Sequence, residues 1–199
     1  MVYSLKLGVW KKVQDCIYWL LREVNGTLVG GALNWIATKD PFVGRSSLIL
    51  VDFTHGSETF EEMPFPQNFG KPSQLNLTEL GECLCLLLGY VTDAMNNVLD
   101  HVDIWLMKDY RVKESWVKLF SVEQLEDYQH FSYLRSISDS VTGREVLLEM
   151  DHRKFLWYNI EEKALKRAKI SVGLAYFESF VSLGNLVPLY GGGNERTEL

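Results

Sequence analysis

The sequence predicts an all-β fold, and three observations support that prediction. Short apolar or alternating stretches bounded by turn residues run through most of the 199 residues, while helical patterns are poor. Aromatic residues make up 13% of the chain, including six Trp, and such side chains suit a pleated, half-buried sheet surface. One strand–turn–strand pattern occurs several times along the chain. Together these features indicate a repeated arrangement of antiparallel strands.

The repeated hairpin is clearest at residues 103–119, where an alternating strand, a polar turn and a second strand beginning at Trp116 follow one another. The other copies place Trp10, Phe60 and Leu165 at the same point, which gives spacings of 50, 56 and 49 residues. A period near about 50 residues is typical of kelch-type propeller blades, against about 40–45 for the WD type. We therefore predict a β-propeller of four-stranded antiparallel kelch-like blades over residues 1–190, with a disordered tail at 191–199.

Taken in order, the chain begins with a hairpin at residues 1–13 that is equivalent to the last two strands of a blade. An apolar connector, which could form a strand in its own right, follows at residues 16–23. Complete blades are predicted at 25–66, 75–122 and 131–170, with one more strand candidate at 176–183. About three to four blades are thus present. Because propellers have about 4–8 blades, the chain could close as a small four-bladed ring in which the last strand joins the first hairpin. Its start in the middle of a blade favours part of a longer propeller instead, with an apolar blade face exposed.

Individual strands follow from local pattern. Gly30 and Gly31 supply the positive φ that a two-residue hairpin turn requires. Residues 48–51 and 83–88 are continuously apolar, which predicts strands covered on both faces. Residues 161–169 contain helix formers, but their place in the repeat predicts a turn and a strand. We expect the repeated Trp side chains to pack in the core or between blades; these are Trp10, Trp35, Trp105, Trp116 and Trp157.

The longer connections are predicted at one end of the blades and the short turns at the other. The long ones are residues 38–47, 64–73, 92–100 and 121–130. Loops on a rigid scaffold are where recognition usually occurs, so we predict a partner-binding surface there. Its candidate residues are the apolar anchors Phe42, Phe65, Phe69 and Met95 and the charged donors Lys39 and Arg45. The alternative is that two or more of the phenylalanines simply fill the underside of their own loops.

Composition excludes several functional classes. A net charge of −6 argues against nucleic acid, whose phosphates need a basic surface. The three cysteines do not form a disulfide framework and are expected to be small buried hydrophobic residues in a reducing compartment. No signal peptide and no apolar stretch long enough to span a membrane is present. We therefore expect a cytoplasmic or nuclear location, without membrane or nucleic-acid partners.

Catalytic chemistry has little support in the sequence. No nucleophile elbow, metal-ligand spacing or phosphate-binding loop occurs, so neither a metal nor a cofactor is predicted. Asp100, His101 and Asp103 could serve proton transfer, but adjacent strand residues point to opposite faces and should not converge. A small hydrolase-like propeller enzyme, with its site at the channel mouth, remains the alternative to a binding module. A secreted carbohydrate-binding propeller would require glycans on Asn25 or Asn76.

Four stretches resemble a known family, the F-box-associated, kelch-like domain of plant F-box proteins. They are VYSL at residues 2–5 with Trp10, VNG at 24–26 with GALNW at 31–35, VDIWLMK at 102–108 with ESW at 114–116, and YFESFVSL at 176–183. The stretches cover nearly the whole chain, and their combination is specific. Two departures are Asn34, where the family usually has His, and the extra residues between Gly26 and Gly31.

The resemblance implies the target-recognition domain of a substrate-binding subunit of an SCF-type ubiquitin ligase. In that family an F-box docks on the Skp adaptor of the cullin complex, while the propeller binds the protein to be ubiquitinated. No F-box motif stands in these 199 residues. The resemblance therefore carries target binding to this chain, and Skp and cullin binding only if the full-length protein has an F-box.

Overall fold

The computed structural model describes residues 1–4, 7–21, 26–40, 42, 47–54, 56–93, 98–123, 134–139, 144–151 and 154–168. All of them belong to Met1–Ala168, the first of two units into which the chain divides. The predicted strand at 176–183 and the predicted tail at 191–199 lie outside the described residues, as do the candidate site residues Arg45 and Met95.

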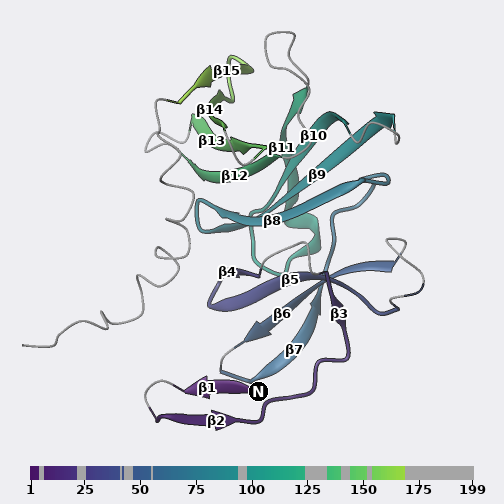
Figure 1. Ribbon diagram of the computed structural model, residues 1–199, viewed down its shortest axis with the longest axis vertical. Coiled ribbons are helices and arrows are strands. Elements are labelled where there is room, and N and C mark those ends of the chain that lie inside the picture. The colour runs from purple at the N-terminus through teal and green to yellow at the C-terminus, as the bar shows by residue number, and fades with distance from the viewer. Residues whose placement is uncertain are drawn as a thin grey trace, which may run out of the picture. The chain divides into compact units, whose positions relative to one another are not determined.

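The described residues contain no α-helix and form antiparallel sheets that follow one another along the chain (Figure 1). The N-terminal hairpin pairs β1 (Val2–Ser4) with β2 (Val9–Lys11). The first sheet contains β3 (Trp19–Leu20), β4 (Thr27–Val29), β5 (Ala32–Thr38), β6 (Leu48–Thr54) and β7 (Thr59–Met63). The second contains β8 (Gln74–Leu80), β9 (Cys83–Asp93), β10 (Val98–Met107) and β11 (Trp116–Glu123), and the third β12 (Leu134–Asp139), β13 (Glu145–Met150), β14 (Lys154–Asn159) and β15 (Ala164–Arg167). This all-β arrangement of four-stranded sheets confirms the predicted partial propeller fold.

The first sheet is also a four-position meander, because β3 and β4 are two segments of one edge strand. Trp19 lies opposite Thr38 near the end of β5, whereas β4 lies opposite the beginning of β5. Both occupy the same edge of β5, since β6 occupies the other. The order β3/β4, β5, β6, β7 therefore matches the order β8, β9, β10, β11 of the second sheet.

The turn between β4 and β5 has the predicted glycine conformation, with φ of 61° at Gly30 and 76° at Gly31. The buried Asn34 amide supports this turn by donating to three backbone carbonyls. They are those of Thr27, Val29 and Ala32, at 3.1, 3.4 and 2.9 Å. Asn34, which stands where the resembled family has His, thus satisfies carbonyls at the end of the hairpin.

Strand β9 is covered on both faces, as its continuous apolar sequence predicts. Leu84, Leu86 and Leu88 belong to the buried cluster that joins the first and second sheets. Cys85 and Leu87 belong to a different cluster, which joins the second and third sheets. Successive side chains on a strand point to opposite faces, so one inner strand contributes to both interfaces. This is the packing expected of an inner strand between adjacent blades.

The Trp116 side chain connects the second sheet to the end of the first sheet. Its side chain is buried, with 7% exposed, and its indole N–H donates to the carbonyl of Pro64 at 2.9 Å. Trp116 begins β11 directly after the 3₁₀ turn Lys113–Ser115, and β7 ends at Met63, one residue before Pro64. The tryptophan that the repeat pattern singles out is therefore an inter-sheet contact.

A second connection between these sheets is polar, and we call Asn34, Asp52, Tyr110 and Arg111 the Tyr110 latch. The Tyr110 hydroxyl lies 2.7 Å from Asn34 Oδ1 and 3.0 Å from Asp52 Oδ2, and these two acceptors share its single proton. Arg111 Nε lies 3.5 Å from Asp52 Oδ2, and its guanidinium also pairs with Glu61. Asp52 is fully buried, and within the described residues its Oδ1 has no hydrogen-bond partner. The latch joins the β10–β11 turn to the first sheet.

Two predictions about burial near the N-terminus are wrong. Trp10 on β2 is 66% exposed and contacts the ring of Tyr3, with 5.2 Å between ring centroids, although it occupies the repeat position of Trp116. Tyr3, its partner across the hairpin, is 43% exposed, so this face of the hairpin is open to solvent within the described residues. Cys16 is exposed because it lies in the connection between β2 and β3. Trp35, Trp105 and Trp157 are half-buried.

The prediction of a loop at residues 92–100 is also wrong in its bounds. Strand β9 continues to Asp93 and β10 begins at Val98, so only residues 94–97 separate them. Register shifts at Leu99 allow the two strands to remain paired past the irregularity. The predicted turn and strand within 161–169 are confirmed, since Asn159 Oδ1 accepts from the backbone N–H groups of Glu161 and Glu162 before β15.

Candidate recognition surface

Two long connections leave the first sheet at the same end, which we call the loop end. They are residues 39–47, between β5 and β6, and residues 64–73, between β7 and β8. Thr38 pairs with Leu48 and Met63 pairs with Leu50, so β5, β6 and β7 all reach this end. The loop end is where the sequence places the candidate partner-binding residues.

Lys39 extends from the end of β5 and pairs with Glu62 on β7. Its Nζ lies 2.8 Å from Glu62 Oε1, and both side chains are substantially exposed. The hydrogen bond to Glu62 raises the pKa of the Lys39 ammonium. Tyr18 also donates its hydroxyl to Glu62 Oε1, at 3.3 Å. The pair with Glu62 holds the Lys39 ammonium at a defined place on the surface. Because exposed ion pairs contribute little free energy, Lys39 could exchange Glu62 for an acceptor on a partner.

Phe42 is the most exposed of the described candidate anchors, with 96% of its side chain accessible. Its backbone N–H donates to Asp40 Oδ1 at 2.8 Å, which closes a local side-chain-to-backbone turn. The Asp40 backbone in turn contacts Thr38 Oγ1, which is 2.6 Å from Ser47 Oγ across the connection. A large apolar side chain is thus held at the tip of an internally bonded loop.

Phe65 and Phe69 lie in the second connection but are half-buried. Their rings contact each other, with 5.0 Å between centroids, and both pack against the cluster joining the first and second sheets. The Tyr90 hydroxyl donates to the Phe69 carbonyl and ties the connection to β9. In this arrangement the two phenylalanines fill the underside of their own loop. Of the six candidates, Lys39 and Phe42 are the described ones that lie at the surface.

The free energy of unfolding should fall as the pH rises above about 10, and Tyr90→Phe is expected to make this decrease smaller. Burial raises the pKa of the Tyr90 phenol from 10.0 to about 12. The folded protein therefore holds the phenol proton more tightly than the unfolded chain does. The contribution of this proton to the free energy of unfolding is complete below pH 10 and is lost as the pH rises through about 12. Urea unfolding between about pH 9 and pH 11 measures the slope. The exposed Tyr3→Phe is the control, and a Tyr90→Phe slope equal to that of the parent would contradict the assignment.

The structure adds two residues that the sequence did not single out. Trp19 is on β3, opposite Thr38, and 59% of its side chain is exposed; Ile17, two residues earlier, is 74% exposed. Its pairing places Trp19 opposite the residue that directly precedes the connection carrying Lys39 and Phe42. The sequence contained a usable signal, because a Trp and an Ile two positions apart in a supposed connector fit the alternation of a strand.

The candidate catalytic residues do meet, contrary to the prediction from strand alternation. His101 Nδ1 lies 2.8 Å from Asp100 Oδ2, and its Nε2 lies 3.9 Å from Asp103 Oδ1. The register shift between Leu99 and His101 breaks the alternation that would have separated Asp100 from His101, whereas Asp103, two residues further on, shares the face of His101. The imidazole also stacks on Tyr90, with 4.7 Å between ring centroids.

This cluster lacks the connectivity of a nucleophilic site. The neighbouring Ser121 hydroxyl donates to Asp103 Oδ1 at 2.6 Å, and Lys118 Nζ lies 2.7 Å from the same oxygen. In a Ser–His site the histidine accepts the proton of the serine hydroxyl. Here the Ser121 proton is directed to the Asp103 carboxylate and not to His101. The cluster is a network on β10 and β11 in which the buried Asp103 carboxylate pairs with Lys118 and accepts from Ser121. A search of the described residues finds no group of side chains able to hold a metal ion, and no helix long and apolar enough to cross a membrane.

Comparison with known proteins gives a consistent result. A sequence model described as the F-box associated β-propeller domain matches residues 1–184. The F-box protein CPR1 of Arabidopsis thaliana is 31% identical over 183 residues, which is 85% of this chain and 42% of the relative. The F-box protein At4g22390 of the same plant is 26% identical over 181 residues, covering 85% of this chain and 43% of the relative.

A third similar protein is the Arabidopsis F-box/kelch-repeat protein At3g23880, 30% identical over 131 residues, or 64% of this chain and 33% of the relative. The chain thus spans about two fifths of the length of the first two relatives and a third of the last. The residues matched by the family model include the loop end described above.

Proposed function

The chain belongs to the F-box associated β-propeller domain family, and from that membership we propose that it is the target-recognition part of an F-box protein. The observation that carries the proposal is the family match over residues 1–184, together with relatives that are named F-box proteins. In the finer form of the proposal, the full-length protein is the substrate-binding subunit of an SCF-type ubiquitin ligase. An F-box, where present, would bind the Skp adaptor and through it the cullin.

The proposed role needs no chemistry from this chain. It requires a rigid scaffold that presents a surface to the target, and the inter-sheet contacts of Trp116 and the Tyr110 latch support such a scaffold. The exposed Phe42 and the paired Lys39 at the loop end provide an apolar anchor and a charged neighbour. That combination is typical of the energetically important part of a protein–protein interface.

We propose that the protein works in the cytoplasm or the nucleus. All three cysteines are free thiols, which supports a reducing compartment. Burial also raises the pKa of the Cys85 thiol to about 12, so this side chain remains protonated and behaves as a buried apolar group.

The experiment that tests this function compares the chain alone with the chain joined to the F-box of a relative, both expressed in plant cells. We expect the F-box fusion to shorten the half-life of a co-purifying protein through the proteasome. The chain alone should bind that protein and lengthen its half-life, because it occupies the target without delivering it. Half-lives are measured after translation is stopped. If the fusion changes the half-life of no co-purifying protein, the proposal is wrong.

A hydrolase remains the candidate from a different class, favoured only by the convergence of His101, Asp100 and Asp103. Because the Ser121 hydroxyl is committed to Asp103, we expect the chain to give no turnover on a panel of ester, amide and phosphoester substrates. Turnover that disappears in His101→Ala would establish an enzymatic activity and contradict the non-enzymatic role.

A further inference from the structure

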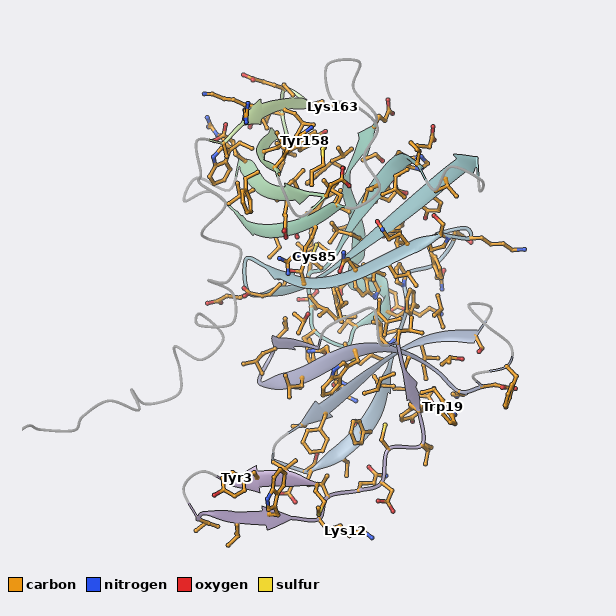
Figure 2. The ribbon with its side chains drawn as sticks, viewed as in Figure 1. Tyr3, Lys12, Trp19, Cys85, Tyr158 and Lys163 are labelled. Atoms are coloured by element: carbon orange, nitrogen blue, oxygen red, sulfur yellow. The ribbon has the colours of Figure 1, made fainter. Side chains whose placement is uncertain are left out.

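A cavity of about 480 Å³ lies between the second and third sheets, and we propose that it binds the indole side chain of a tryptophan presented by the target. One wall is the end of β11, residues 119–123, and the other is the β14–β15 hairpin. Figure 2 labels two of the hairpin residues that line the cavity, Tyr158 and Lys163. All lining residues belong to the described part of the chain. The inference rests on the proposed function and deepens it, because it names the site and the chemical class of the bound group.

The strand registers show that the cavity lies where Trp116 lies at the neighbouring interface. On the second sheet Trp116 of β11 is opposite Met107 of β10, and both side chains belong to the cluster shared with the first sheet. On the third sheet Leu165 of β15 is opposite Tyr158 of β14, and both pack in the cluster shared with the second sheet. Alternate buried residues of the inner strands correspond in the same way. They are Leu84, Leu86 and Leu88 on β9 and Val146, Leu148 and Met150 on β13. Leu165 therefore occupies the position of Trp116 with a much smaller side chain.

The carbonyl group that accepts from Trp116 also has a counterpart beside the cavity. The Trp116 indole N–H donates to Pro64, the residue directly after β7. Counted along the strand ladders from the repeated position, Ser121 on β11 is the counterpart of Pro64, since a register shift leaves Leu119 outside the pairing. The Ser121 carbonyl accepts the Tyr158 hydroxyl at 3.3 Å, which is long for such a bond. An indole N–H can therefore share or replace this bond.

The walls of the cavity suit a flat apolar ring. The rings of Phe120 and Tyr158 stack on each other, with 4.5 Å between centroids and 19° between planes. The other apolar lining residues are half-buried and pack against the same cluster; they are Leu119, Ile160 and Leu165. Aromatic side chains bury large apolar areas and gain further from contact with other rings. An indole in the cavity would have both kinds of contact.

Charge and size also favour a neutral indole. The charged residues of the lining are Glu123 and Lys163, which are exposed and of opposite sign, so they do not select a charged ring. The volume of about 480 Å³ falls in the range of roughly 300–1,000 Å³ that is usual for ligand sites. The cavity therefore has room for a tryptophan side chain and for part of the backbone that carries it.

Local hydrogen bonds hold the hairpin wall in place before any target binds. Asn159 Oδ1 accepts from the backbone N–H groups of Glu161 and Glu162, at 3.0 and 2.9 Å. The Ile160 backbone N–H donates to the Arg144 carbonyl at 2.9 Å, which ties the turn to the residue before β13. A wall that is already positioned loses less conformational entropy on binding.

A second cavity, of about 520 Å³, lies beside the same repeated position of the first sheet but differs at that position. There Phe60 corresponds to Trp116, and its ring contacts Phe53 and Trp35, with 4.9 and 6.2 Å between centroids. An aromatic side chain of the chain itself thus fills the position in the first sheet, whereas Leu165 leaves it open in the third. The cavity beside Leu165 is therefore the one that lacks an aromatic ring.

Fluorine NMR of neutral probes with the purified 199-residue chain tests the site. The probes are the N-acetyl amides of 5-fluorotryptophan, of its 1-methyl derivative and of 4-fluorophenylalanine. We expect the first probe to bind most tightly. The other two lack the indole N–H, so each should bind about fivefold more weakly or less, the cost of one hydrogen bond. Equal binding of all three probes would overturn the assignment.

Leu165→Trp supplies an indole from within the chain and should weaken binding of the tryptophan probe at least about tenfold. Its midpoint of thermal unfolding should be unchanged or higher, because the new ring fills the cavity, and this shows that the loss of binding is not caused by unfolding. Leu165→Phe, a smaller change at the same position, should weaken binding in the same direction and replaces Leu165→Trp if that variant does not fold.

The matched control is Phe60→Trp, which changes the same repeated position at the second cavity and should leave probe binding unchanged. A loss of binding in Phe60→Trp with none in Leu165→Trp would place the probe in the second cavity and overturn the proposal.

The half-life experiment separates this inference from the function on which it rests. The F-box fusion carrying Leu165→Trp should no longer shorten the half-life of the target. If it still does, the cavity is not the anchor for the target, even where the probe binds, and the function stands. If the unsubstituted fusion has no effect, the function fails, and with it the role of the cavity in binding a target.

Discussion

Trp116→Ala is expected to lower the free energy of unfolding by about 3–5 kcal/mol, the range for truncating a buried aromatic side chain. Trp116 belongs to the cluster that joins the first and second sheets, and its indole N–H donates to Pro64 at 2.9 Å. Truncation removes the packing of the ring and the hydrogen bond together. Within the described residues the first two sheets share no backbone ladder, so side-chain contacts of this kind hold them against each other.

Trp10→Ala is the matched control, because Trp10 occupies the same position of the repeated hairpin but is 66% exposed. Its removal should change the free energy of unfolding by no more than about 0.5 kcal/mol, as is usual for surface substitutions. Denaturant unfolding followed by far-ultraviolet circular dichroism measures both variants without relying on tryptophan emission. Similar losses in the two variants would contradict the inter-sheet role of Trp116.

Trp10 and Trp116 also show which properties of the repeated hairpin follow from the sequence and which do not. The alternation of the strands, the glycine turn at residues 30–31 and the unbroken apolar run of β9 are local properties, and each appears in the structure as the sequence predicts. Local pattern cannot distinguish Trp10 from Trp116, however. Burial depends on which element packs over the ring, and that element is remote in sequence.

The candidate surface shows the same limit. Phe42, Phe65 and Phe69 are all aromatic residues in long connections, yet Phe42 is almost fully exposed while the other two pack on the core. The difference arises from Tyr90, which fixes the second connection to β9 through the Phe69 carbonyl. Trp19 was missed for the opposite reason. Its strand is only Trp19–Leu20, and pairing with β5, not propensity, defines it.

No sequence pattern indicated the Tyr110 latch. Asn34, Asp52, Tyr110 and Arg111 lie on three separate elements, and each alone has the character of a surface polar residue. Only the packing of the β10–β11 turn against the first sheet brings them together. The ring of Tyr110 lies so close to Gly30 that a Cβ there would be 3.1 Å from it. A side chain at this position would therefore press on the Tyr110 ring, and glycine also suits the φ of 61°.

Tyr110→Phe is expected to lower the free energy of unfolding by about 1–3 kcal/mol near neutral pH, the cost of leaving buried polar groups without a partner. The substitution keeps the ring over Gly30 and removes only the hydroxyl. It removes the donor of Asn34 Oδ1 and leaves Asp52 Oδ2 with only Arg111 Nε, at 3.5 Å, while Asp52 Oδ1 already lacks a partner among the described residues. The loss should therefore be large for a change of one oxygen atom.

The decrease in the free energy of unfolding caused by Tyr110→Phe should also depend on pH, and the protonation of Asp52 determines the direction of that dependence. Burial raises the pKa of the Asp52 carboxyl above 3.8, and the Tyr110 hydrogen bond and Arg111 partly oppose this. The folded protein therefore binds the Asp52 proton more tightly than the unfolded chain does. The contribution of this proton to the free energy of unfolding is complete below pH 3.8 and is lost as the pH rises through the pKa of the folded state. Removing the hydroxyl raises the folded pKa further, so the deficit of Tyr110→Phe should be smallest in acid and grow toward neutral pH.

A double-mutant cycle with Asp52→Asn isolates this interaction. In the Asp52→Asn background the latch contains no buried carboxylate, so Tyr110→Phe should cost less than in the parent, and its cost should not vary with pH. We expect a coupling energy of about 1 kcal/mol or more near neutral pH that decreases in acid. Urea unfolding of the four proteins at several pH values provides the measurement. Additive losses at every pH would mean that the hydroxyl and the carboxylate stabilise the fold independently, and that Asp52 is held by Arg111 alone.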